Sequence, residues 1–113
     1  SQSNRRQAAL VKDLIESKER LDIPDVVLSE TEYILRKKYH RSRKDIHKVF
    51  QFLIERPNLH LSDHARQALL IFQTNSIDMA DSLVIAQAQN QSAALATFDK
   101  QMLAVSKTKA YWR

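Results

Sequence analysis

The sequence predicts an α/β domain in which helices flank a parallel sheet and right-handed crossovers join the strands. Segments with apolar residues at three- and four-residue spacing, typical of amphipathic helices, recur along the 113 residues. Short runs of strand-like residues separate these segments. One of these runs, 93–98, is short and apolar at every position but Thr97, as expected for a buried parallel strand. The length is that of one domain, 1–113.

The first half of the chain begins with a helix expected over residues 7–19, where apolar residues recur at helical spacing. A short strand over 21–24 contains a β-branched residue. Pro24 and Asp25 supply a break and then a cap, so a second helix is expected over 26–39.

A third helix starts at Ser42, which forms an acidic variant of the capping box with Asp45, and it stops before Pro57. Residues 58–61 alternate polar and apolar side chains and are expected to form a short strand. A fourth helix is expected over 62–73 because a serine and an aspartate at its start are good N-caps.

The last third of the chain contains two turns, at Asn75 and Asn90. Between them, the helix expected over 77–89 is apolar on most sides, so it should pack against two neighbours. The strand 93–98 follows, and Asp99 opens one or two further helical turns. The chain has no glycine, so one or both asparagines are expected to adopt positive φ.

The absence of glycine and cysteine excludes several classes of protein. Dinucleotide fingerprints, Walker A loops and nucleophile elbows need glycine where the backbone adopts positive φ or approaches a ligand. Disulfides, thiol nucleophiles and cysteine-ligated zinc sites are excluded as well. The polar start of the chain has no signal-peptide core and no apolar run is long enough to span a membrane, so we expect a cytoplasmic protein without membrane contact.

Basic residues concentrate in two segments of a chain with a net charge of +5. Residues 36–48 contain seven basic side chains and one acid, and residues 100–113 contain four basic side chains and no acid. This pattern suits a bound polyanion, although solvated helix ends beside a loop are an equally good interpretation. The basic residues expected to contact a nucleic acid are Arg36, Lys37, Lys38, Arg41, Arg43 and Lys44.

Three carboxylates interrupt apolar patterns. Glu30 shares a helical face with Val27 and Ile34, and Asp81 lies among apolar residues of its own helix in the same way. Asp99 follows the strand 93–98, at the sheet edge where α/β proteins bind ligands. Because buried carboxylates need donors or a cation, these residues predict a shared Mg²⁺ or Mn²⁺ site.

Each of these acids also has a structural explanation. Asp99 could cap the helix that follows it, Asp81 could pair with a basic residue, and Glu30 could cap a helix or pair with the basic segment. His60 and His64, four residues apart, are a less favoured alternative metal site, because a helix start between them need not place both rings on one face.

The segments IPDVVLSE (23–30), IDMADSL (77–83) and ATFDK (96–100) together resemble the PIN-domain nucleases, and among them the VapC-type toxins of toxin-antitoxin systems. The resemblance covers nearly the whole chain. It implies a three-layer domain and a ribonuclease that uses Mg²⁺ or Mn²⁺. It also implies a cognate antitoxin protein as partner and, commonly, a homodimer.

The resemblance assigns roles to individual residues. Glu30, Asp81 and Asp99 would be catalytic and would bind the metal together with Asp78, and the hydroxyl of Thr97 would support the site. The family pattern opens with a central strand that ends in an aspartate, and no such strand precedes the first helix expected here. We therefore expect this chain to lack the central first strand.

Two functions follow from this reasoning. One is a metal-dependent endoribonuclease in which water attacks the scissile phosphate and the basic segment 36–48 contacts the RNA backbone. The other is a non-catalytic module that binds RNA or protein. In such a module Tyr111 and Trp112 would stack on bases or dock on a partner, unless they simply cover the end of the core.

Overall fold

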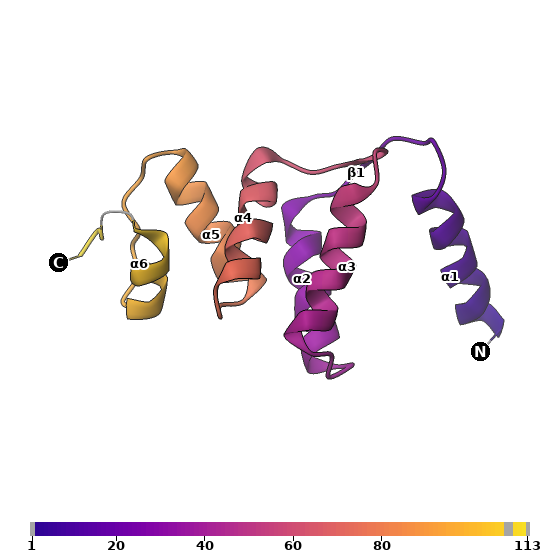
Figure 1. Ribbon diagram of the computed structural model, residues 1–113, viewed down its shortest axis with the longest axis horizontal. Coiled ribbons are helices and arrows are strands. Elements are labelled where there is room, and N and C mark those ends of the chain that lie inside the picture. The colour runs from indigo at the N-terminus through magenta and orange to yellow at the C-terminus, as the bar shows by residue number, and fades with distance from the viewer. Residues whose placement is uncertain (1, 108–109, 113) are drawn as a thin grey trace.

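The computed structural model describes residues 2–107 and 110–112, which are mostly helical (Figure 1). The elements follow one another along an elongated molecule measuring 54 × 29 × 19 Å, with α1 at one end and α6 toward the other. In chain order they are α1 (Gln2–Ile15), β1 (Leu21–Asp22), α2 (Asp25–Lys37), α3 (Arg43–Glu55), β2 (Leu59–His60), α4 (Asp63–Thr74), α5 (Met79–Asn90) and α6 (Lys100–Ser106).

The two short strands confirm that the sheet is parallel. Leu21 pairs with Leu59 and Asp22 with His60. The backbone N–H of Leu21 also donates to the carbonyl of Asn58 at 2.8 Å. The protein is therefore an α/β molecule whose sheet, within the described residues, is small in comparison with its helices.

Polar side chains at the helix starts explain where most helices begin. Ser42 accepts a hydrogen bond from the N–H of Asp45, and Ser62 accepts one from Ala65, as the sequence predicts. Asp25 is not the cap of α2: Pro24 is the N-cap residue and Asp25 is the first helical residue.

The first helix is displaced toward the N-terminus, because it covers Gln2–Ile15 and not 7–19. Ser17 explains its end. The Ser17 hydroxyl donates to the carbonyl of Leu14 at 2.6 Å and accepts from the N–H of Glu19 at 3.1 Å. These local bonds satisfy backbone groups that a continuing helix would have used.

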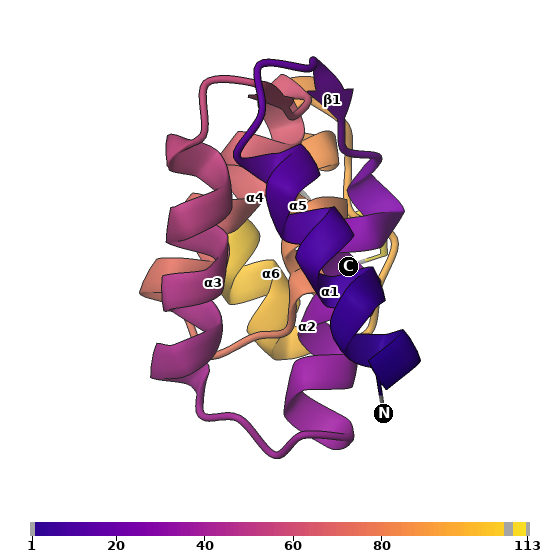
Figure 2. The ribbon, with the colours of Figure 1, turned by 90° about the vertical axis from the view of Figure 1, so that its right-hand side faces the viewer.

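The main core lies between α2, α3, α4 and α5, and Figure 2 shows these helices grouped behind α1. α5 packs against α2, α4 and α6, which confirms the expectation of at least two neighbours. A second cluster connects α5 with α6. The buried side chains of the main core are Leu28, Ile46, Phe50, Ala65, Ala68, Leu69, Phe72, Met79 and Ala86.

The segment 93–98 is not the buried strand that its composition predicts. Within the described residues, it makes one isolated parallel bridge, between Leu95 and Ala110. Leu95 is buried, whereas Phe98 is 81% exposed. The prediction was wrong because an apolar run becomes a buried strand only when other strands lie beside it, and the β1–β2 pair lies elsewhere.

The prediction of positive φ at the two asparagines was also wrong. Asn75 is extended, with φ −136°, and Asn90 is the last residue of α5. The Asn75 side chain instead donates from Nδ2 to the carbonyl of Ile71 at 3.0 Å, which satisfies the end of α4. In the described chain, positive φ occurs at His40, Ser92 and Lys107.

Candidate acidic site

The N-terminus of α5 carries two of the predicted site residues. Asp78 is the N-cap of this helix, and its Oδ1 accepts a hydrogen bond from the N–H of Asp81 at 2.8 Å. The carbonyl of Asp78 also accepts from the Ser82 hydroxyl at 2.8 Å. Capping therefore holds Asp78 and Asp81 one turn apart at the positive end of the helix dipole.

Asp81 interacts electrostatically with an aspartate that is distant in the sequence. Partial burial raises the pKa of the Asp81 carboxyl, and the negative charges of Asp78 and then Asp99 raise it further. α5 and α6 pack against each other, and Asp99 lies near enough to Asp81 for its charge to act on that carboxyl. The structure thus associates three of the four predicted acids.

Asp99 is the N-cap of α6, which confirms the structural alternative for this residue. Its Oδ1 accepts from the N–H groups of Gln101 at 2.9 Å and Met102 at 3.2 Å. The N–H of Asp99 in turn donates to the Thr97 hydroxyl at 3.0 Å. Thr97 therefore positions the loop that presents Asp99, and both capping bonds go to one carboxylate oxygen, Oδ1.

Glu30 does not face inward, so that expectation was wrong. It is exposed, and its neighbours Val27 and Ile34 are 39% and 45% exposed. The buried face of α2 is instead the one that carries Leu28. Glu30 nevertheless lines an open depression together with Ala80 at the start of α5, so it lies near the helix that carries Asp81.

Glu32 is a buried carboxylate that the sequence analysis did not identify. It is 2% exposed, and its Oε1 accepts from the N–H of Met79 at 2.9 Å while its Oε2 accepts from Nε of Arg36 at 2.7 Å. The four-residue spacing of Glu32 and Arg36, on the helical face of Leu28, was the signal that could have found it. Glu32 thus connects α2 directly to the start of α5.

Arg43 has a structural role in addition to the predicted contact with nucleic acid. Its guanidinium donates to the carbonyls of Phe72, Asn75 and Ile77, the last at 2.7 Å. It also lies 3.9 Å from the centroid of the Phe72 ring. These contacts fix the connection between α4 and α5, so Arg43 is committed to the fold that presents Asp78.

Of the remaining residues predicted to contact nucleic acid, one forms an ion pair within the fold and the others are exposed on the surface. Arg36 is paired with Glu32. Four others are exposed around the connection between α2 and α3, and they are Lys37, Lys38, Arg41 and Lys44. Lys109 and Arg113, of the second basic segment, lie outside the described residues.

No preformed metal centre exists among residues 2–107 and 110–112, where no three histidine, cysteine or acidic side chains are grouped closely enough to hold an ion. The His60 and His64 alternative also finds no support, because Nε2 of His64 pairs with the carboxylate of Asp25. The carboxylates that are suitable ligands for Mg²⁺ therefore lie near one another, but they are not close enough to bind one ion together.

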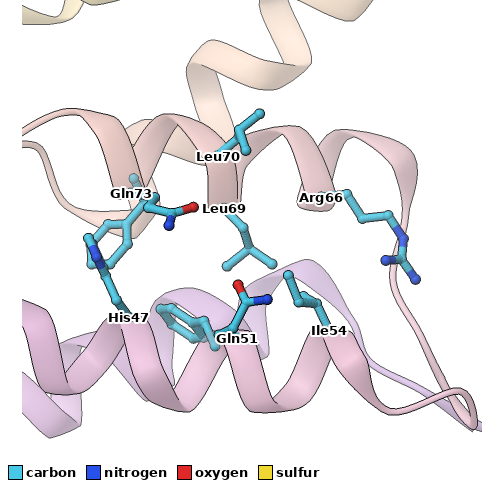
Figure 3. Close-up of a pocket in the computed structure, with 9 residues that line it drawn as sticks. His47, Gln51, Ile54, Arg66, Leu69, Leu70 and Gln73 are labelled. Carbon is cyan, nitrogen blue, oxygen red and sulfur yellow. The ribbon is translucent and has the colours of Figure 1, made fainter.

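A different cavity lies between α3 and α4 (Figure 3). It measures about 50 Å³, and its polar lining includes His47, Gln51, Arg66 and Gln73. No carboxylate lines it, and it has room for a few water molecules only. This cavity is therefore separate from the acidic residues.

The fold and the grouped aspartates define a helix-rich α/β protein with acidic residues at adjacent helix starts. The family model of the PIN domain matches residues 2–108, and the chain belongs to this family. PIN domains are usually nucleases, and membership of the family therefore supports nuclease activity in general. No curated protein and no solved structure matches the chain.

None of the helices in the described part of the chain is long and apolar enough to cross a membrane.

Proposed function

We propose that this protein is a metal-dependent endoribonuclease that hydrolyses phosphodiester bonds in RNA. The observation that carries the proposal is the grouping of Asp78, Asp81 and Asp99 at the starts of two packed helices. Membership of the PIN family supports the same chemistry. Structural acids are normally paired with basic groups, whereas the neighbouring charges that raise the pKa of Asp81 are other carboxylates.

The aspartates have the chemistry to hold Mg²⁺ or Mn²⁺, because these hard cations prefer carboxylate oxygen. Burial raises the pKa of Asp81 first, and the charges of Asp78 and Asp99 raise it further; a bound cation would compensate that negative charge. Such an ion would activate water and stabilise charge on the phosphate. Asp81 and Asp99 would be ligands of the ion, and Glu30 of α2 would be a further one. Asp78 would bind the ion while it caps α5, and Thr97 positions Asp99.

The test is incubation of the protein with RNA, with Mg²⁺ or Mn²⁺ and with EDTA. We expect cleavage with either ion, loss of cleavage in EDTA, and loss in Asp81→Asn. Asp63→Asn is the matched control, because Asp63 is an exposed acid in the first turn of α4 and is not one of the proposed metal ligands. Cleavage that survives both EDTA and Asp81→Asn would rule out the proposal.

We further propose that another strand covers the exposed face of α2 and α5. Support comes from apolar side chains that water contacts: Val27, Ile34 and Val84 are 39%, 45% and 48% exposed. The acid at the end of such a strand would complete the metal site. The variant Val27→Ser, purified from the native host, tests this proposal. If a strand covers Val27, the substitution should lower the free energy of unfolding by about 1–3 kcal/mol. If Val27 is exposed, it should lower it by less than about 0.5 kcal/mol.

We propose that the protein acts in the cytoplasm as the toxin of a toxin-antitoxin pair. Its partners would be a cognate antitoxin protein and a second copy of the chain in a homodimer. The three motif segments that resemble VapC-type toxins support it. Expression of the chain should arrest growth of its host, and co-expression of the antitoxin should restore it. Growth unaffected by an active nuclease would exclude the toxin role.

A non-catalytic binding module is the second candidate. One observation favours it: in the part of the chain that the structure describes, the acids do not form a metal-holding group. Calorimetric titration with Mn²⁺ separates the two functions. A nuclease should bind the ion in a manner that Asp81→Asn weakens at least tenfold, whereas a binding module should show no carboxylate-dependent binding.

A further inference from the structure

We propose that Phe98 and Trp112 form a stacking platform that holds a base of single-stranded RNA beside the acidic residues. This inference rests on the proposed ribonuclease function and adds to it a site for the substrate base. The two rings are parallel, with an angle of 9° between their planes and a centroid distance of 4.6 Å. They come from segments on either side of α6.

Phe98 offers a free aromatic surface. It is 81% exposed although one of its faces is covered by Trp112. An aromatic ring left in water contributes little to folding, since the hydrophobic effect rewards burial. A ring with one face covered and the other open can extend its stack by one more planar group, and a nucleobase is such a group.

The platform is held in place by contacts that do not involve the free face. Tyr111 contacts Trp112 edge to face, with centroids 5.4 Å apart. The N–H of Tyr111 donates to the carbonyl of Leu95 at 3.0 Å, next to the bridge between Leu95 and Ala110. These bonds tie the end of the chain to the segment that carries Phe98, so the stack is set before a ligand arrives.

Position and charge indicate RNA as the occupant. Phe98 directly precedes Asp99, the N-cap of α6, and α6 packs against α5, the helix that carries Asp81, so a strand with a base on the platform would pass close to the acidic residues. Lys100 and Lys107 are exposed on α6 and at its end, and residues 100–113 contain no acid. The phosphates of a strand that follows α6 would therefore meet positive charge at both ends of this helix.

The sequence provides a direct probe, because Trp112 is the one tryptophan of the chain. The ligands are an eight-nucleotide single-stranded oligoadenylate and an oligomer of equal length and charge whose central positions are abasic. Titrations are done in EDTA, so cleavage does not interfere. We expect oligoadenylate to quench Trp112 emission, and the abasic oligomer to bind about tenfold more weakly with less quenching.

Variants of the exposed aromatic rings complete the test. Phe98→Ala should weaken binding of oligoadenylate about tenfold, and Phe98→Tyr, which keeps the ring, should restore it. Phe52→Ala is the matched control, since Phe52 is also an exposed phenylalanine, 45% exposed on α3, and should bind like the parent protein. Thermal unfolding of Phe98→Ala should match the parent, because so exposed a ring adds little to stability.

Three results would overturn the platform. One is equal binding and quenching by the abasic oligomer, and another is unchanged binding in Phe98→Ala. The third is the loss of a dimer in Phe98→Ala, measured by sedimentation, which would mean that this surface binds a second copy of the chain. The two proposals can fail separately. If the protein cleaves RNA but Phe98→Ala binds RNA like the parent, only the platform is refuted. If bases quench Trp112 but the protein cleaves no RNA in Mn²⁺, only the nuclease function is refuted.

Discussion

The Oε1 atom of Glu32 accepts a hydrogen bond from the backbone N–H of Met79 at 2.9 Å. This bond joins the middle of α2 to the first residue of α5, next to Asp78 and two residues before Asp81. A buried carboxylate thus satisfies a free N–H at a helix start and fixes where that helix begins. The position of the candidate acidic site depends on this contact.

Replacement of Glu32 should destabilise the protein. Glu32→Ala removes the acceptor of Met79 N–H and the partner of Arg36, and the cost should be about 3 kcal/mol, because a buried donor is left unsatisfied. Glu30→Ala is the control on the same helix, and its exposed side chain should change stability by less than about 0.5 kcal/mol. Urea denaturation measures both, and equal effects would contradict the role assigned to Glu32.

Arg43 should contribute to stability more than any ordinary surface arginine. Arg43→Lys keeps the charge, but the shorter lysine has no planar guanidinium to stack on Phe72 while Nη2 contacts the carbonyls, so we expect a loss of about 2–3 kcal/mol. Arg41→Lys, two residues earlier and exposed, should have no measurable effect. Thermal unfolding of the two variants provides the comparison, and a destabilised Arg41→Lys would show that the charge pattern matters more than these contacts.

Variants of Asp99 separate its capping role from its charge. Asparagine caps a helix as well as aspartate does, so Asp99→Asn should keep the stability of the parent within about 0.5 kcal/mol, while Asp99→Ala should lose about 1 kcal/mol. Both should lose Mn²⁺-dependent cleavage. An active Asp99→Asn enzyme would mean that the residue serves only as a cap.

The raised pKa of Asp81 makes stability depend on pH. A folded-state pKa above the unfolded value means that the folded protein binds the proton more tightly. Stability should therefore fall as the pH rises from the unfolded pKa of aspartate through the raised folded value. Asp81→Asn removes this effect, so the variant should be more stable than the parent at neutral pH and should lose the advantage in acid.

Urea denaturation of the parent and of Asp81→Asn across this pH range measures the difference between them. A difference that is independent of pH would show that neither burial nor the charges of Asp78 and Asp99 raise the pKa of Asp81 in solution.

The exposed basic residues between α2 and α3 should control the salt dependence of RNA binding. Lys37→Gln and Lys38→Gln together should weaken binding and reduce the slope of log Kd against log salt by about 1.4, since each contact with single-stranded RNA releases about 0.7 counterions. Fluorescence anisotropy at several salt concentrations measures the slope. Lys12→Gln, on α1, is the control and should leave it unchanged.

The expected helices and the two short strands are present because their signals are local. Each of these signals acts within a few residues, so it can be recognised without the rest of the molecule. Examples are the apolar spacing within a helix, the capping serines Ser42 and Ser62, and the helix-stopping Pro57. The segment 93–98 failed as a prediction because a buried strand depends on neighbours that the chain places elsewhere. Asn75 failed because its turn is stabilised by its own side chain and by Arg43, more than thirty residues away.

The sequence alone determined the helical periodicity, the caps, the exclusion of chemistries that need glycine or cysteine, and the acidic residue types. These features follow from the properties of single residues and their near neighbours. Only the tertiary structure decided which carboxylates are buried and which ones lie near one another. Glu30 and Glu32 are two residues apart on one helix, yet packing against α5 exposes the first and buries the second. The burial of a side chain and its electrostatic interactions depend on segments that are distant in the sequence, so residue spacing cannot predict them.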